Sequence, residues 1–230
     1  MFWILFIGQF LYIIILKWID PPFTLTQLGS LFSGNGLKRD YIDKEEMSPY
    51  AGLAVIASED QLFPDHNGFD WKSIQKAMEK NQKSKRIAGA STISQQVAKN
   101  VFLWQGRTWL RKGLETYFTF MIEWIWSKER ILEMYLNVAE MGKGIFGIEA
   151  AAQHYFKKPA AKLTKTQAAM IAACLPNPVQ YTIKPPSKYV TARYPWVLQQ
   201  MNNLESAEDI RQVLPGPSKT VKDKSAGRGK

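Results

Sequence analysis

Residues 48–59 read SPYAGLAVIASE, and this stretch sets the helical character of the chain. Ser48 is a favoured N-cap residue and Pro49 suits the first helical position, so we predict a helix that begins there and runs to about Ser58. Apolar side chains recur at helical spacing in the segments outward from it, at 70–82, 91–103, 108–126 and 128–140. Since no part of the chain alternates apolar and polar residues for long, the sequence predicts an all-α fold without a large sheet.

Composition limits the classes of function. The chain has 230 residues, with 30 Lys and Arg against 20 Asp and Glu, so its formal net charge is +10. This length suits one sizeable domain that buries a core without disulfides. The single cysteine, Cys174, excludes an intramolecular disulfide, and neither histidine is spaced from it as in a zinc site. The positive charge favours an anionic partner: nucleic acid, anionic lipid or a pyrophosphate-bearing substrate.

The N-terminus carries an apolar run, FWILFIGQFLYIIIL, at residues 2–16. Lys17 and Trp18 extend this run and two prolines at 21–22 end it. A membrane-spanning helix needs about 17–20 residues, so we expect residues 1–19 to form a single-pass anchor. Two alternatives stay open, namely a cleaved signal peptide, although the usual cleavage site and positive n-region are missing, and a core helix.

The rest of the chain is predicted to fall into three parts. Residues 20–47 have a mixed-charge composition typical of a connector, and residues 48–203 form the folded domain. Residues 204–230 form a basic tail, rich in Pro, Gly and Ser from residue 215, which predicts disorder.

Basic residues concentrate in one part of the predicted domain. Between Lys72 and Lys112 there are ten basic residues and one acid, Glu79, so this window alone carries a charge of +9. It is either a solvated helix face or a groove for phosphate groups, which guanidinium groups bind well.

Two other motifs are set aside. The G-x-G-x-x-G at 142–147 follows a helical segment rather than a strand, so we interpret it as a helix end and loop and not as a dinucleotide site. The S-x-x-K at 73–76 lacks the companion motifs of penicillin-binding transpeptidases.

Four motifs follow one another along the chain. They are E-D-x-x-F-x-x-H-x-G-x-D from Glu59, G-A-S-T-I-S-Q-Q-x-x-K-N from Gly89, R-K-x-x-E from Arg111 and K-x-x-I-L-x-x-Y-L-N from Lys128. In this order, over about residues 45–200, they resemble the peptidoglycan glycosyltransferase domain of class A penicillin-binding proteins and of monofunctional biosynthetic transglycosylases. The resemblance implies a lysozyme-like domain of two helical lobes with a cleft between them, behind the N-terminal transmembrane helix.

The resemblance also implies an activity. Members of this family transfer the growing lipid-linked glycan to the C4 hydroxyl of lipid II and release undecaprenyl pyrophosphate. The alcohol needs a general base, and the leaving pyrophosphate needs cations. About 30 residues follow Met201, too few for a transpeptidase domain, so we expect the monofunctional type.

By resemblance, Glu59 is the general base and Glu115 is the second essential carboxylate, on the donor side. A structural Arg111–Glu115 pair is the alternative for Glu115. Substrate-binding residues carried over in the same way are Ser91, Gln95 and Gln96 as polar contacts, and Lys99, Arg107 and Arg111 as a pyrophosphate clamp. Lys112 either joins the clamp or is surface charge.

Other motif positions are less specific. Phe63 and His66 either contact substrate or fix a loop by packing, whereas Asn137 and Glu149 are interpreted as mainly structural. The apolar side chains at 118–126 either dip into lipid or belong to the core.

The expected surroundings follow from the resemblance. The cofactor is a divalent cation, Mg²⁺ or Mn²⁺, and no organic cofactor is expected. The partners are lipid II, the growing glycan strand and the membrane, with other cell-wall synthesis proteins as further candidates and no nucleic acid. The location is the bacterial inner (cytoplasmic) membrane, with the catalytic domain on the periplasmic side.

Two competing functions remain. A lysozyme-like hydrolase or lytic transglycosylase needs an acid to protonate the glycosidic oxygen and has no use for a phosphate clamp. A membrane-tethered basic module that binds any polyanion leaves the two carboxylates unexplained.

Overall fold

A computed structural model describes residues 2–83, 91–106 and 108–216, and its secondary structure is mainly helical. The helices are α1 (Phe2–Ile15), α2 (Leu25–Phe32), α3 (Pro49–Glu59), α4 (Trp71–Lys83), α5 (Ile93–Phe102), α6 (Trp109–Ile125), α7 (Lys128–Val138), α8 (Ile148–Phe156), α9 (Lys165–Cys174), α10 (Lys188–Leu204) and α11 (Glu208–Val213), with short 3-10 helices η1 (Lys44–Glu46) and η2 (Ala160–Lys162). The strands are β1 (Lys38–Arg39), β2 (Glu140–Gly142) and β3 (Ile145–Phe146). The predicted all-α, lysozyme-like class is confirmed.

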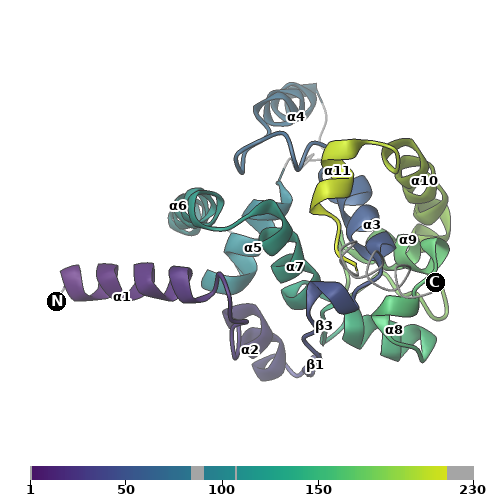
Figure 1. The fold of residues 1–230 in the computed structure, drawn as a ribbon, viewed down its shortest axis with the longest axis horizontal. Coiled ribbons are helices and arrows are strands. Elements are labelled where there is room, and N and C mark those ends of the chain that lie inside the picture. The colour runs from purple at the N-terminus through teal and green to yellow at the C-terminus, as the bar shows by residue number, and fades with distance from the viewer. Residues whose placement is uncertain (1, 84–90, 107, 217–230) are drawn as a thin grey trace, which may run out of the picture.

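Helix α7 lies at the centre and is buried along most of its length. Helices α5 and α6 pack on one side of it, and α3 and α8 pack on the other (Figure 1). Helices α9 and α10 cover the far side of α3. This arrangement brings the C-terminal end of α3 towards α5, and the candidate site lies at that junction.

Helix α3 forms as its sequence predicts. The Ser48 hydroxyl accepts a hydrogen bond from the backbone N–H of Tyr50, and Pro49 occupies the first turn. The helix is buried from Ala51 to Ala57, which explains its uninterrupted small and apolar composition. At Gly52 a Cβ atom would lie 2.5 Å from Cδ of Pro215, so glycine is needed where the C-terminal segment crosses α3.

The disordered tail predicted at 204–230 is partly wrong, because the first part of this segment is folded. Helix α11 lies within it, and Ile210 and Val213 on this helix are buried in the core. The folded domain therefore continues past residue 203, because three apolar side chains at 210, 213 and 214 pack back on it. Residues 217–230 lie outside the described residues.

The connector expected at 20–47 is also structured in part. Thr24 and Gln27 form a capping box at the start of α2, and Gln27 is fully buried. Strand β1 pairs in parallel with β3, and β3 pairs antiparallel with β2, giving a small sheet of order β1-β3-β2.

The G-x-G-x-x-G motif lies on this sheet, so the expected helix end and loop is corrected to a β-hairpin that leads into α8. Gly144 and Gly147 both have positive φ angles, of 67° and 86°. A Cβ at Gly144 would collide with the backbone of Asn35, and one at Gly147 would lie 2.6 Å from the carbonyl oxygen of Asn137. Chain geometry accounts for both glycines.

Helix α1 has 14 residues, and its N-terminal end projects from the body (Figure 1). Its other end is fastened: the indole N–H of Trp126 donates to the carbonyl of Ile13 at 2.8 Å, and the guanidinium of Arg130 donates to the carbonyl of Leu16 at 3.1 Å. Among the described residues, no helix combines the length and the apolar character needed to cross a membrane, so the structure does not contain the spanning helix expected at 1–19.

Candidate active site

Glu59 is the last residue of α3 and lies beside a cavity of about 450 Å³. The amide N–H of Gln96 donates to Oε2 of Glu59 at 2.9 Å, and the Ser58 hydroxyl donates to Oε1 at 3.1 Å. Side chains from three segments line this Glu59 cavity, including Glu59, Asp60, Asp70, Ser73 and Ser91. Hydroxyl and carboxylate groups therefore dominate its polar wall.

The surroundings of Glu59 favour a base stronger than an ordinary glutamate. Burial raises the pKa of its carboxyl above the usual 4.5, although the hydrogen bonds from Gln96 and Ser58 and the positive charge of Arg193 lower it. Because the loss of hydration is the larger effect, the carboxylate gains affinity for a proton.

The two adjacent glutamines of the second motif play different parts. Gln95 is buried and its side chain accepts from the backbone N–H of Thr92 at 3.0 Å, while Thr92 caps α5. Gln95 therefore belongs to a capping box, and Gln96 is the glutamine that the structure brings to Glu59. Ser91 is exposed and lines the Glu59 cavity, as expected of a contact residue.

A second cavity, of about 330 Å³, lies on the other side of Gln96. Lys99 lines it and is mostly buried, so loss of hydration lowers the pKa of its ammonium group, while the charges of Glu115 and Glu59 raise it. Lys99 thus lies within electrostatic range of both candidate carboxylates. Residues that line this Lys99 cavity include Gln96, Lys99, Asn100, Tyr135 and Glu140, together with Ser30 and Asn35 near α2.

Glu115 is buried in α6 with both carboxylate oxygens paired. Nη1 of Arg111 donates to Oε2 at 2.8 Å, and Nζ of Lys112 donates to Oε1. Nε of Arg111 is buried and finds no hydrogen-bond partner among the described residues. The expected pair with Arg111 is therefore present, and it leaves the buried Nε–H of Arg111 without an acceptor among the described residues.

The basic residues that the structure describes between Lys72 and Lys112 lie in two separate places. Lys72, Lys76 and Lys80 are exposed on α4, as a solvated face would be, whereas Lys99 and Arg111 gather around Glu115. Arg107, expected in the same clamp, lies outside the described residues.

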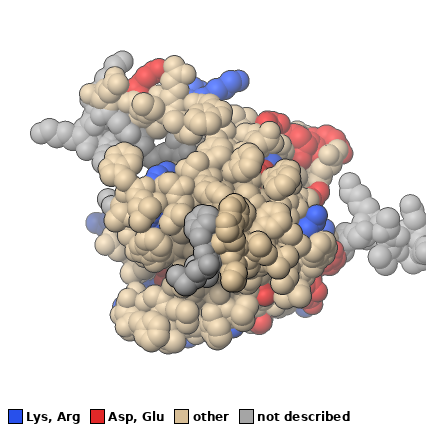
Figure 2. Space-filling view, turned by 90° about the vertical axis from the view of Figure 1, so that its left-hand side faces the viewer, with Lys and Arg blue, Asp and Glu red and all other residues tan. Residues whose placement is uncertain are grey.

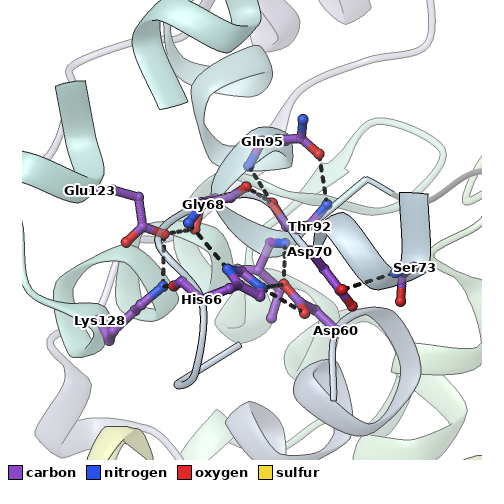
Figure 3. Close-up of polar contacts among 11 residues, drawn as sticks. Asp60, His66, Gly68, Asp70, Ser73, Thr92, Gln95, Glu123 and Lys128 are labelled. Atoms are coloured by element: carbon purple, nitrogen blue, oxygen red, sulfur yellow. Dashed lines mark hydrogen bonds and ion pairs between the residues drawn. The ribbon is translucent and has the colours of Figure 1, made fainter. Parts of the chain in front are cut away.

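The loop after Glu59 is held by a network that the sequence did not reveal (Figure 3). Nε2 of His66 lies 3.0 Å from both carboxylate oxygens of Asp60, and Asp60 also accepts from the backbone N–H of Ile93. Since the backbone N–H of Gly68 donates to Nδ1, the Nε2 atom carries the hydrogen and donates to Asp60. These contacts favour loop fixing over substrate contact for His66.

The same network reaches the next two helices. Nζ of Lys128 donates to Glu123 at 2.8 Å and to the carbonyl of His66, and it lies 4.6 Å from the ring centre of Phe63. Phe63 is fully buried, so it packs within the protein. The first backbone N–H of α5 and side chains from α6 and α7 thereby fix the loop that lines the Glu59 cavity.

Gly68→Ala is expected to destabilise the protein by about 1–3 kcal/mol. Gly68 has a φ of 87°, and a Cβ there would lie 2.7 Å from Cγ2 of Thr119 and 3.0 Å from Cγ of Glu123. The measurement is the midpoint of thermal unfolding. Gly113→Ala in α6 is the matched control, because no atom lies within 4 Å of its Cβ position. Equal midpoints for the two variants would show that the loop does not need this geometry.

Two residues expected to be structural have structural contacts. Asn137 is fully buried and donates to the carbonyl of Ile42 at 3.0 Å. Glu149 accepts from the backbone N–H of Ala160 at 2.6 Å, which fixes the turn after α8.

Comparison with known proteins places this chain in a family. A family model described as Transglycosylase matches residues 26–202. The biosynthetic peptidoglycan transglycosylase of Mannheimia succiniciproducens is 59% identical over 165 residues, 72% of this chain and 68% of that protein. Proteins of the same name from Yersinia pseudotuberculosis and Yersinia pestis are 52% identical over 200 residues, 84% of this chain and 83% of theirs. The chain therefore belongs to the transglycosylase family, as its four motifs predicted.

Proposed function

We propose that this protein polymerises the glycan strands of peptidoglycan. In the proposed reaction, the C4 hydroxyl of lipid II attacks C1 of the growing lipid-linked glycan, and undecaprenyl pyrophosphate leaves. One observation carries the proposal: Glu59 lies beside one cavity, and its partner Gln96 lines a second cavity together with a buried cation, Lys99. The names of the relatives support the same reaction.

The geometry suggests a division of labour. The acceptor sugar enters the Glu59 cavity, and the Glu59 carboxylate takes the proton of the C4 hydroxyl as its oxygen bonds to C1. The C1–O bond to pyrophosphate breaks as the new bond forms, and the pyrophosphate leaves as an anion with the bonding electron pair. Lys99 and the positive charge of Arg111 stabilise that anion, and Glu115 holds Arg111 and Lys112 in place.

The buried cations favour a transferase over a hydrolase. A hydrolase acting on finished glycan must protonate a neutral glycosidic oxygen, whereas a lipid pyrophosphate leaves as an anion. Lys99 is mostly buried, and the loss of hydration disfavours its charged form, so an anion bound beside it in the working complex would stabilise that form.

The divalent cation stays a prediction. Among the residues that the structure describes, no three His, Cys, Asp or Glu side chains are grouped as a metal site would require. Both oxygens of Glu115 also face cations of the protein. These donors therefore do not form a protein-only metal site. Polymerisation with and without EDTA tests whether a divalent cation is required.

The proposed location is the periplasmic face of the bacterial inner membrane, where lipid-linked substrates are bound. The face formed by α1 and α6 carries few charged groups (Figure 2). Exposed apolar side chains on these helices include Ile4, Ile7, Trp109, Leu110, Phe120 and Trp124. Such a surface suits contact with lipid, while Ile122 of α6 and Trp126, which follows this helix, are core residues.

The rate of polymerisation is expected to fall at low pH with a midpoint above 4.5. Burial raises the pKa of Glu59, and only its deprotonated form can accept the C4 proton, so activity is lost as pH falls through that raised value. The measurement is kcat against pH, with unfolding followed in parallel by circular dichroism. A midpoint at or below 4.5 would contradict the expected role of burial.

The proposed function is tested with purified protein, lipid II in detergent, and finished peptidoglycan as a second substrate. Polymer resolved on a gel, without degradation of finished peptidoglycan, supports the polymerase. Degradation without polymer would replace it with the hydrolase. Neither reaction, with salt-sensitive binding to unrelated polyanions, would favour the basic binding module.

A further inference from the structure

Tyr135 carries a buried hydroxyl near Glu59, and the proposed reaction gives this hydroxyl no role. It lies on the central helix α7 and is 1% exposed. Its hydroxyl donates to Oε1 of Gln96 at 3.2 Å, and Nε2 of Gln96 donates to Glu59 at 2.9 Å. A continuous chain of two hydrogen bonds therefore runs from the core to the carboxylate.

The carboxylate of Glu59 sets the direction of these two hydrogen bonds. A carboxylate accepts hydrogen bonds, so the amide nitrogen of Gln96 must face Glu59 and the amide oxygen must face the other way. A glutamine amide can rotate by half a turn, which would present its oxygen to the carboxylate instead. Because a tyrosine hydroxyl can also accept, it is the carboxylate that sets the orientation of the amide, and the Tyr135 hydroxyl reinforces this orientation by donating to the amide oxygen.

The hydroxyl remains a donor across the working range of pH. Burial and the nearby charge of Glu59 raise the pKa of Tyr135 well above 10.0. Its position on a buried helix also limits the motion of the hydroxyl.

We propose that Tyr135 is a positioning residue for the catalytic base: its hydroxyl orients the Gln96 amide, and the amide orients the Glu59 carboxylate. This inference rests on the proposed role of Glu59. It predicts an effect on the base itself, since the Gln96 hydrogen bond stabilises the charged form of Glu59 and lowers its pKa.

Tyr135→Phe removes only the hydroxyl and is the direct test. We expect kcat to fall by about 3–10-fold, the size of one hydrogen bond, with KM for lipid II unchanged within about twofold. The acid limb of the pH profile should move to higher pH, because a less firmly held Gln96 donates less well to Glu59.

Tyr155→Phe is the matched control. Tyr155 is 7% exposed, and its hydroxyl donates to the carbonyl of Met141 at 3.3 Å rather than to Gln96. The Tyr155→Phe variant also loses one buried hydrogen bond of a tyrosine hydroxyl, so a general loss of stability would affect both variants. Only Tyr135→Phe should shift the acid limb.

Two further measurements separate this inference from the proposed function. In a Gln96→Leu background, adding Tyr135→Phe should lower kcat little further, because the two residues act in one chain of hydrogen bonds. A ¹³C NMR titration of the Glu59 carboxyl, which needs no activity, should show a higher pKa in Tyr135→Phe and no change in Tyr155→Phe. An unchanged Glu59 pKa, or full additivity with Gln96→Leu, would overturn the inference. If wild type makes no polymer, the proposed function fails, and the titration still decides whether Tyr135 acts on Glu59.

Discussion

Glu59→Gln is expected to lower the rate of polymerisation by about 10²–10⁴-fold. The glutamine has the same shape: its amide oxygen can replace Oε2 as the acceptor for Gln96, and its amide nitrogen can replace Oε1 beside the Ser58 hydroxyl, which can accept as well as donate, so the cavity should keep its form. What it loses is the ability to take the proton of the attacking hydroxyl. Initial rates with labelled lipid II measure the effect, and KM should change little.

The same substitution should make the protein more stable at neutral pH. Because burial raises the pKa of Glu59 in the folded state, its contribution to stability is full below the usual 4.5 and is lost as pH rises through the raised value. A neutral glutamine avoids this loss. Thermal midpoints should therefore favour Glu59→Gln at pH 7 and converge at low pH, so an inactive variant with a lower midpoint at pH 7 would indicate misfolding instead.

Glu115→Gln is expected to lower activity by about 10²–10³-fold and stability by about 3–5 kcal/mol. The substitution breaks a buried pair with Arg111 and a second pair with Lys112, and it leaves the Arg111 guanidinium without a counter-ion. The expected kinetic effect is on the step in which pyrophosphate departs. Rates are compared below the unfolding temperature of the variant.

Glu133→Gln supplies the control for this experiment. Glu133 forms an ion pair with Arg130 at 2.8 Å on α7 and lines neither cavity. The Glu133→Gln variant should be less stable than wild type and should keep its activity at temperatures where it is folded. If Glu115→Gln keeps comparable activity under those conditions, the Arg111–Glu115 pair is only structural.

Local signals predicted the helices well. Ser48 and Pro49 place the start of α3, because capping and the fixed φ of proline act within one turn. The elements missed were those that depend on distant partners. Helix α11 carries too few apolar residues for a clear period, and Ile210 and Val213 become core residues only because the chain returns to pack there.

At the candidate site, too, contacts that depend on the three-dimensional fold could not be predicted from the sequence. The motifs pointed to Glu59, Gln96 and Lys99, and the structure brings these three together. They could not distinguish Gln95 from Gln96, because adjacent helix residues face different directions and the capping role of Gln95 competes with substrate contact. The Asp60–His66 contact could not be predicted either, since it depends on the fold of a loop without a regular period.

The central claim is that Glu59 is the base of a glycan polymerase, and one measurement tests it most directly. Wild type, Glu59→Gln and Glu133→Gln, each shown to be folded, are incubated with labelled lipid II, and the products are resolved on a gel. The account predicts polymer from wild type and Glu133→Gln, and none from Glu59→Gln on the same time scale. Equal polymer from wild type and Glu59→Gln would contradict it.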